Sequence, residues 1–493
     1  MPSISDILER LGPCLSSRLS TELCAVKNIK AAAARKQIER AKLAKQILSV
    51  QGIKFQHNEQ FLYTKKQERT KQLQAALLDA LLGSRSAYRL PMLGVQARGG
   101  LIPSYLFPTF SGFPLLSREN RQDCNSALSH LIKSELLVHN VHSDTISMSS
   151  SFAPHPVSET RHHARLVGED LLLLAVKDWC RLQGLLTFEK VSLRGPTDCP
   201  QFGFFQWDLV GPSYVAPLCH FSGEGVIPGF VVVDVILGRK LSRADVTPFI
   251  HKSMTIRSNP NNRPFLAMLI ADWFEKDALQ DGRKMGLLFT TPKNLFNVSL
   301  AELIDDFTQA FEQKKKFLEA KPDYLHKILM NLGMIGHLQG AYQAASKQLF
   351  FLLLDYCYNR LRKTSAIYNR SLKLSGAVDL YLETDNEAIA CQCIWKESNA
   401  LVQESESLQW IESLPQLLKS LTLSKKQQTQ ALICTNRQFT PAAIARLREA
   451  SVLHPIAWLD GPTLRTLLEP LNPDLNQDIP ETILDPITET AKV

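Results

Sequence analysis

Apolar residues near the N-terminus are first spaced as in helices and then alternate as in strands. The spacing predicts helices over residues 4–13 and 15–26, and a third helix from about residue 28 to residue 50. The next segment, IKFQHNEQFLYTKK, alternates like two strands joined by a polar turn at His57, Asn58 and Glu59. Three helices followed by a β-hairpin are the element order of a winged helix-turn-helix, which we expect over residues 1–72.

A second, divergent copy of this order is expected over residues 73–150. LQAALLDALLGS predicts an apolar helix, NRQDCNSALSHLIKSELLVHN a helix running into a strand, and DTISM a returning strand. Residues 90–114 lie between them, are rich in Gly, Pro and aromatic residues, and are expected to form an ordered insertion. Residues 147–163, which include SMSSSFAPHPVSE, are predicted to form a linker.

One pattern then occurs twice in the remainder of the chain. A long helix precedes a strand that carries Asp208 and a strand centred on Asp234. A second long helix precedes strands that carry Asp379 and Gln392. Further helices and apolar strands follow each pair, which predicts two α/β domains over residues 160–300 and 335–475. Residues 301–334 are expected to form a helical connection. The predicted fold class is therefore a multidomain α/β protein.

Composition limits the class of protein. The chain has 493 residues, of which 45% are hydrophobic and 21% are charged, as in globular proteins with sizeable cores. We find no uncharged apolar run near the length of a membrane span and no secretory signal at the start. The 10 cysteines are scattered without a CxxC motif, which is typical of reduced thiols. We therefore expect a cytoplasmic protein that does not associate with a membrane.

Positive charge is concentrated at the N-terminus. Residues 1–71 hold 14 Lys and Arg against 6 Asp and Glu, an excess equal to the net charge of +8 of the whole chain. Because a segregated basic surface attracts polyanions, we expect double-stranded DNA as the partner, held mainly by phosphate contacts. The alternative is an ordinary solvated helix. The residues expected to bind DNA lie on the third helix and at its ends: Lys27, Lys30, Arg35, Lys36, Arg40, Lys42 and Lys45.

Asp379 and Gln392 are candidates for chemistry. They lie 13 residues apart with the turn TDNE between them, so we expect them on neighbouring antiparallel strands. Hard oxygen ligands on adjacent strands can share Mg²⁺ or Mn²⁺, which would support phosphodiester cleavage.

The region around these residues resembles a known family. Gly340, Tyr342 and Gln343 begin the pattern, Asp379 and Gln392 follow, TNRQFTPA occupies residues 435–442, and Asp460-Gly461 precedes LRTLL. Over about residues 335–470 this resembles the Mrr-type restriction endonucleases of the PD-(D/E)xK nuclease fold. The resemblance implies a metal-dependent DNA endonuclease, in foreign-DNA defence or mobile-element processing. In that function Asp379 and Gln392 would hold the metal, and Gln343 would be an outer helper.

The sequence departs from this family at one position. Ile394 stands where the family has lysine, and Lys396 is the nearest basic residue, on the same strand face by alternation. Lys396 is therefore the candidate to support the attacking water or the developing charge. The alternative is a non-catalytic DNA-binding regulator or assembly subunit that uses nuclease-like folds as a scaffold. A third possibility is an active site completed by a partner subunit, in a homodimer or with another protein. Whether Lys396 reaches Asp379 and Gln392 distinguishes the first two.

The first α/β domain is a looser copy of the second. Asp208 and Asp234 would match Asp379 and Gln392, and Lys240 is the basic residue that follows. We expect these three residues to form a degenerate second site, retained for packing or for DNA contact.

Overall fold

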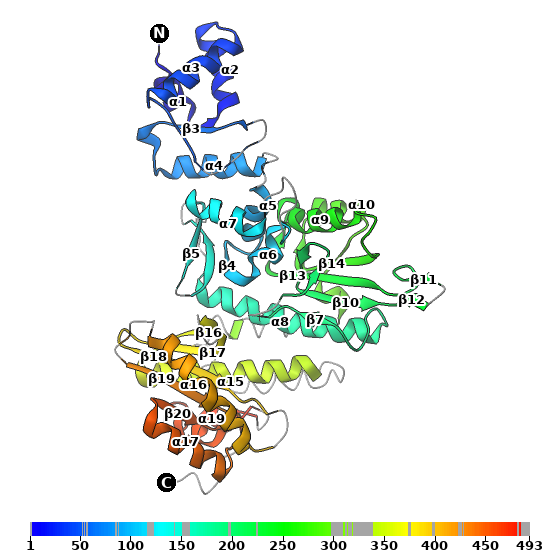
Figure 1. Ribbon diagram of the computed structural model, residues 1–493, viewed down its shortest axis with the longest axis vertical. Coiled ribbons are helices and arrows are strands. Elements are labelled where there is room, and N and C mark those ends of the chain that lie inside the picture. The colour runs from blue at the N-terminus through cyan, green and yellow to red at the C-terminus, as the bar shows by residue number, and fades with distance from the viewer. Residues whose placement is uncertain are drawn as a thin grey trace.

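The computed structural model describes most of the chain (Figure 1). The described residues are 2–51, 53, 55, 58–83, 86, 88–115, 123–141, 143–149, 158–195, 199–222, 225–296, 309, 310, 313, 318, 339–372, 376–396, 400–422, 426, 428–480, 483 and 484. The predicted helical connection over residues 301–334 therefore lies almost entirely outside them. None of the described helices is both long and apolar enough to cross a membrane.

The first N-terminal unit contains three helices and a small antiparallel sheet. Its elements are α1 (Ile4–Leu11), β1 (Cys14–Leu15), α2 (Ser16–Lys27), α3 (Ala31–Leu43), β2 (Leu48–Ser49) and β3 (Phe61–Tyr63). The strand order is β1-β3-β2. Ser3 and Asp6 form a capping box that starts α1. The expected third helix was too long, because the chain leaves α3 after Leu43 and adopts a positive φ at Lys45.

The second unit repeats this order of elements. After α4 (Lys71–Gly83) come α5 (Arg89–Ala97), β4 (Leu101–Pro103), η3 (Ser104–Leu106), α6 (Phe107–Ser111), α7 (Cys124–Lys133), β5 (Leu137–Asn140) and β6 (Thr145–Met148). The strand order β4-β6-β5 again places the last strand between the other two. The segment expected to be an insertion supplies α5, β4 and α6, so that expectation was wrong. A Cβ at Gly94 would lie only 2.0 Å from the Phe110 carbonyl oxygen, so glycine permits α5 and α6 to pack closely.

The first α/β domain is a five-stranded mixed sheet flanked by helices. The chain passes through α8 (Glu159–Leu182), β7 (Ser192–Leu193), β8 (Gln201–Phe202), β9 (Phe205–Gln206), β10 (Leu209–Ser213), β11 (His220–Ser222), β12 (Gly225–Ile227), β13 (Gly229–Leu241), α9 (Arg243–Arg257), β14 (Phe265–Phe274), α10 (Lys276–Lys284), β15 (Leu288–Thr290) and α11 (Pro292–Leu295). The sheet order is β15-β14-β13-β10-β7. The predicted linker ends earlier than expected, because Ser158 caps α8 and residues 159–163 are helical.

The C-terminal α/β domain has the same plan. Its elements are α15 (Gln339–Arg362), β16 (Ser365–Leu372), β17 (Gly376–Glu383), β18 (Glu387–Cys393), α16 (Glu404–Thr422), β19 (Gln428–Cys434), α17 (Pro441–Leu453), β20 (Ile456–Leu459), α18 (Gly461–Leu468) and α19 (Pro473–Asp478). The sheet order is β16-β17-β18-β19-β20. Taken in chain order, the first and second strands of each sheet are antiparallel, and so are the second and third. The third, fourth and fifth strands are parallel to one another.

The strand registers of the two sheets are also equivalent. Leu209, directly after Asp208, pairs with Val233, directly before Asp234. Leu380, directly after Asp379, pairs with Cys391, directly before Gln392. The structure thus agrees with the expected repeat, in which Asp208 corresponds to Asp379 and Asp234 to Gln392.

Helices α8 and α15 lie side by side between the two sheets (Figure 1). Their apolar residues belong to one buried cluster that also contains Val231 and Val233 of the first sheet and Leu380 and Cys391 of the second. His163 of α8 stacks on Tyr368 of β16, with ring centroids 3.9 Å apart. The two α/β domains therefore share one hydrophobic core.

Candidate functional site

Asp379 forms an ion pair with a residue that the sequence analysis did not select. Its Oδ1 lies 3.0 Å from Nζ of Lys347 on α15, and its Oδ2 accepts a hydrogen bond of 2.8 Å from the backbone N–H of Cys393. The side chains of Lys347 and Asp379 are 33% and 24% exposed, so solvent reaches the pair. Gln343 lies one helical turn before Lys347 on α15 and is partly buried.

The charge of Lys347 is fixed by this pair. Burial lowers the pKa of Lys347, but Asp379, by its charge and its hydrogen bond, together with Cys393 and Cys434 raises it more, so the pKa lies above its ordinary value. A lysine with a raised pKa stays protonated at neutral pH and is a poor general base. Lys347 therefore neutralises Asp379 and holds it in place.

Gln392 and Lys396 are directed toward a different helix. Gln392 Oε1 accepts a hydrogen bond of 2.8 Å from Nε1 of Trp410, and Lys396 Nζ lies 2.6 and 2.7 Å from the two carboxylate oxygens of Glu406. Trp410 and Glu406 belong to α16, which packs on the sheet face opposite to α15. The expected convergence of Asp379, Gln392 and Lys396 is therefore absent.

Strand alternation places Gln392 and the two cysteines beside it on opposite faces of the sheet, while β17 departs from alternation at Asp379, between Val378 on the α16 face and Leu380 on the α15 face. Successive residues of β18 point to opposite faces of the sheet. Cys391, Cys393 and Trp395 pack with the cluster that contains α15, whereas Ile394 packs with the cluster that contains α16. On the α15 face, this strand and the residues directly after it therefore carry thiols and an indole, in place of a second carboxylate and a lysine.

The residues present do not fit a bound Mg²⁺ or Mn²⁺. Such ions prefer several oxygen ligands around one point. Both oxygens of Asp379 already accept hydrogen bonds, and the oxygen of Gln392 is held by Trp410 on the other face. In the described part of the chain, no three His, Cys, Asp or Glu side chains are placed to hold a metal ion.

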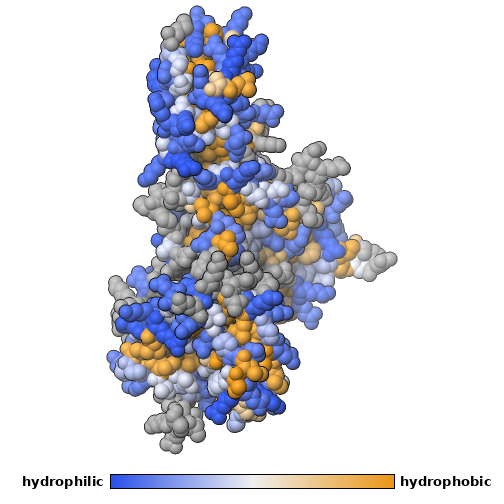
Figure 2. All heavy atoms as spheres, turned by 60° about the vertical axis from the view of Figure 1, so that its left-hand side comes forward, coloured by the Kyte–Doolittle hydropathy of each residue, from blue (hydrophilic) through white to orange (hydrophobic). Residues whose placement is uncertain are grey.

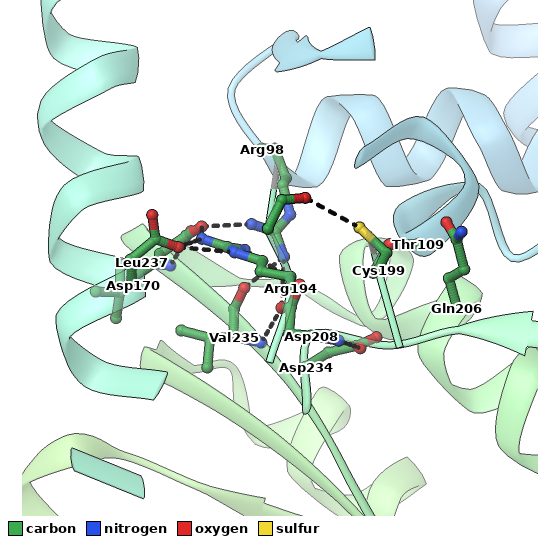
Figure 3. A network of polar contacts seen from close by, with 12 residues as sticks. Arg98, Thr109, Asp170, Arg194, Cys199, Gln206, Asp208, Asp234, Val235 and Leu237 are labelled. Atoms are coloured by element: carbon green, nitrogen blue, oxygen red, sulfur yellow. Dashed lines mark hydrogen bonds and ion pairs between the residues drawn. The ribbon is translucent and has the colours of Figure 1, made fainter. Parts of the chain in front are cut away.

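The equivalent carboxylate in the first domain is held in the same way but is sealed from solvent. Asp208 Oδ2 accepts a hydrogen bond of 2.8 Å from the N–H of Val235, just as Asp379 accepts one from Cys393. Around Asp208, however, lies a network of buried charges (Figure 3). Arg194 lies 3.1 Å from Asp208 and 3.0 Å from Glu169 of α8, and the side chains of all three residues are at most 1% exposed.

Arg98 brings the second N-terminal unit into this network. Its guanidinium lies 2.7 Å from Glu169 and 3.5 Å from Asp208, donates to the Val235 carbonyl and stacks on the ring of Phe110. Arg165 of α8 reaches in the opposite direction and donates to the carbonyl oxygens of Arg98 and Leu101. An arginine of the second unit thus bonds to the first α/β domain, and an arginine of that domain bonds to the second unit, which joins the two.

Asp234 is neutralised by a lysine from α9. Nζ of Lys252 lies 2.5 Å from Asp234 Oδ2 and 3.0 Å from the carbonyl oxygens of Thr109 and Gln206. Burial raises the pKa of Asp234, and Lys252 opposes the rise. Lys240 does not join this pair, because it is exposed and follows a register irregularity after Ile236. The expected role of Lys240 in a degenerate site is therefore wrong, and Lys252 supplies the ammonium group.

Sequence reasoning missed Lys347, Arg98, Glu169, Arg194 and Lys252. The sequence did contain a signal for Glu169. With Asp170 it interrupts the apolar run of α8, and a charge within such a run needs a buried partner. The sequence contained no such signal for Arg98 and Lys252, because their partners Glu169 and Asp234 lie 71 and 18 residues away.

The basic residues at the N-terminus lie mostly on one surface. Helix α3 buries Ala34, Ile38 and Ala41 and exposes Arg35, Lys36 and Arg40 on its other side. Lys30 and Lys45, near the two ends of the helix, are also exposed. Lys27 and Lys42 are partly buried and contact Gln37 and Glu39, respectively. In the second unit, the corresponding helix α7 is fully described and exposes Asn125, Ser129 and Lys133, of which one is basic.

The chain matches no protein-family model, no curated protein and no solved structure.

The buried network makes Arg98 important for stability. We expect Arg98→Ala to lower the free energy of unfolding by about 3–5 kcal/mol, because Glu169 and Asp208 lose a partner in a dry environment. Arg243→Ala is the matched control, because Arg243 pairs with Asp281 while its side chain is 71% exposed, and it should cost at most about 1 kcal/mol. Urea denaturation followed by circular dichroism measures both. Equal losses would show that the network contributes no more than a surface pair.

His162 should make stability depend on pH. Its Nδ1 lies 2.8 Å from the Arg165 guanidinium, and burial, with Arg165 second, holds the pKa of His162 well below its ordinary value. As pH falls from 7 to 5, the unfolded chain binds a proton that folded His162 does not, so the free energy of unfolding should fall by about 2 kcal/mol from this group. His162→Gln should remove that part of the decrease in urea denaturation, whereas exposed His220→Gln should not. The same pH dependence in both variants would contradict this account.

Proposed function

We propose that this protein binds double-stranded DNA through its first N-terminal unit, acting as a winged helix-turn-helix. Its two α/β domains would form a nuclease-like scaffold that does not cleave. The observation that carries the proposal is the exposed face of α3, where Arg35, Lys36 and Arg40 lie opposite the buried apolar side of the helix. The order of helices and strands supports it, because in winged helices the third helix is presented to the DNA.

The N-terminal end of α3 favours close approach to a DNA groove. Ala31, Ala32 and Ala33 are all exposed and have the smallest side chains that still favour a helix. An α-helix fits the major groove, and methyl groups can contact the methyl group of thymine there. The basic residues that follow along the helix would then lie near the phosphates on either side of the groove.

The surface of the first unit is suited to a charged partner. Figure 2 shows that the part of the molecule containing this unit, at the top, is covered mainly by hydrophilic side chains. Residues 1–71 hold the whole excess of positive charge in the chain. The second unit repeats the topology without the basic helix, which favours a connecting role for it.

The non-catalytic part of the proposal is supported by the surroundings of Asp379. A metal-dependent endonuclease, the function implied by the family resemblance, needs a second oxygen ligand beside the aspartate and a lysine near the reacting phosphate. Gln392 and Lys396 are engaged with α16 on the other face, and Lys347 neutralises the aspartate. Asp379 is therefore better explained as a residue that fixes the end of β18 to α15.

The DNA-binding proposal predicts a strong effect of charge reversal on α3. Replacing Arg35, Lys36 and Arg40 together with Glu should raise Kd for duplex DNA on the order of 100-fold or more. The slope of log Kd against log salt should fall by about 3, because three phosphate contacts are lost. Fluorescence anisotropy with a labelled duplex and the full chain measures both quantities.

The matched control reverses three charges elsewhere. Lys276, Arg283 and Lys284 are exposed residues of α10, and their replacement with Glu changes the net charge by the same amount. This variant should retain most of the affinity. If the two triple variants lose affinity equally, binding reflects net charge alone and α3 is not the DNA-binding surface.

A further inference from the structure

Three cysteines lie close together beside the Asp379–Lys347 ion pair. Cys391 and Cys393 follow one another on the α15 face of β18, and Cys434 ends the neighbouring strand β19. Cys393 and Cys434 are direct partners in the parallel register of the two strands. The Cys434 thiol donates a hydrogen bond of 3.4 Å to the carbonyl oxygen of Gln392, the residue directly before Cys393.

This arrangement meets the geometric condition for a disulfide. Neighbouring strands lie about 4.8 Å apart, so paired Cα atoms are close to that separation. Disulfides join residues whose Cα atoms are about 4.4–6.8 Å apart and whose Cβ atoms point the same way. Cys393 and Cys434 are register partners on adjacent strands, and both side chains belong to the cluster that packs against α15, so their pairing and their shared face both favour a bond between them.

The repeated fold shows that these thiols are not required for packing. Because Asp208 corresponds to Asp379, the first-domain equivalents of Cys393 and Cys434 are Val235 and Ile270, which are paired in the same way on β13 and β14. Val235 and Ile270 are fully buried. An apolar pair therefore serves the fold at this position, and the C-terminal domain carries two thiols where two aliphatic side chains suffice.

We propose that Cys393 and Cys434 form a reversible redox site, in which hydrogen peroxide or a similar hydroperoxide converts the two thiols to a disulfide. Cys393 is the attacking residue because it is partly exposed, whereas Cys434 is fully buried. Lys347 lies close enough to interact electrostatically with Cys393.

The chemistry balances in two steps. The Cys393 thiolate attacks one peroxide oxygen, the O–O bond breaks, and a sulfenic acid and hydroxide form, the hydroxide taking a proton from solvent. The Cys434 sulfur then attacks the sulfenic sulfur, the S–S bond forms, the S–O bond breaks, and water leaves with the thiol proton. Two electrons pass from the thiols to the peroxide, which becomes two water molecules. A dithiol reductant reverses the reaction by thiol–disulfide exchange.

The disulfide would covalently link the C-terminal ends of β18 and β19. Cys393 is the last residue of β18 and Cys434 the last of β19, and the chain beyond them is already connected through Lys396 and Asn436, which exchange two hydrogen bonds. A disulfide would join the strands beside the Cys393 N–H that holds Asp379. The site does not depend on DNA binding, so it can be tested separately.

The test is thiol mapping of the full chain. The reduced protein is treated with hydrogen peroxide, the remaining thiols are alkylated, and the non-reduced digest is analysed by mass spectrometry. We expect a cross-linked peptide pair containing Cys393 and Cys434, two alkylated thiols fewer than the 10 of the untreated chain, and full reversal by dithiothreitol. Cys24 of α2 is the internal reference, because it is also partly exposed.

Two variants keep the result interpretable. In Cys434→Ala the cross-link should disappear, and the Cys393 sulfenic acid should be trapped by dimedone. The double variant Cys393→Val, Cys434→Ile restores the apolar pair of the first domain, so it should fold and lose both oxidisable thiols. Oxidation of Cys393 at the same rate as Cys24 without a cross-link, or a cross-link to a different cysteine, would overturn the proposal.

Discussion

The packing of α8 against α15 is the constraint on which the two α/β domains depend. Each helix is apolar toward its own sheet and toward the other helix, and leucines 171–174 are consecutive in α8. A helix that is apolar on most of its surface must be buried on more than one side. Neither domain can bury its helix alone, so the two domains complete a single core and should unfold together.

The same constraint explains how the two copies diverged. In the first copy the equivalent aspartate, Asp208, lies against the second N-terminal unit, where Arg98 and Arg194 neutralise it without solvent. In the C-terminal copy no part of the N-terminal units occupies the equivalent position among the described residues, and Lys347 neutralises Asp379 within the domain. In both, the aspartate accepts a hydrogen bond from the neighbouring strand, so it has a structural role independent of any chemistry.

Much of the fold could be predicted from the sequence, because short-range patterns determine it. Alternation and the spacing of Asp208, Asp234, Asp379 and Gln392 predicted the repeated strand pair, and helical spacing located α8 and α15. The candidate site could not be predicted as well, because it depends on which face each residue occupies. Leu380 and Cys391, which lie beside Asp379 and Gln392 in the chain, are register partners. Alternation breaks at Asp379, because Val378 packs with the α16 cluster and Leu380 with the α15 cluster, so Asp379 and Gln392 contact helices on opposite faces.

Long-range partners were beyond sequence reasoning for a different reason. Lys396 is near Gln392 in sequence, yet its ammonium group bonds Glu406, because α16 returns over that face of the sheet. Lys347 precedes Asp379 by 32 residues and reaches it only when α15 packs on the sheet. The direction of a side chain on a strand follows from tertiary packing, which local patterns do not determine.

The central claim is that the first N-terminal unit binds DNA and the two α/β domains do not cleave it. A plasmid assay with the full chain tests this claim most directly. Supercoiled plasmid is incubated with the protein in Mg²⁺, Mn²⁺ or EDTA, analysed for binding by gel shift, and then freed of protein to examine the DNA itself. The account predicts a shifted plasmid that remains supercoiled under all three conditions. Nicked or linear DNA that appears with Mg²⁺ or Mn²⁺ and disappears in Asp379→Asn would contradict it.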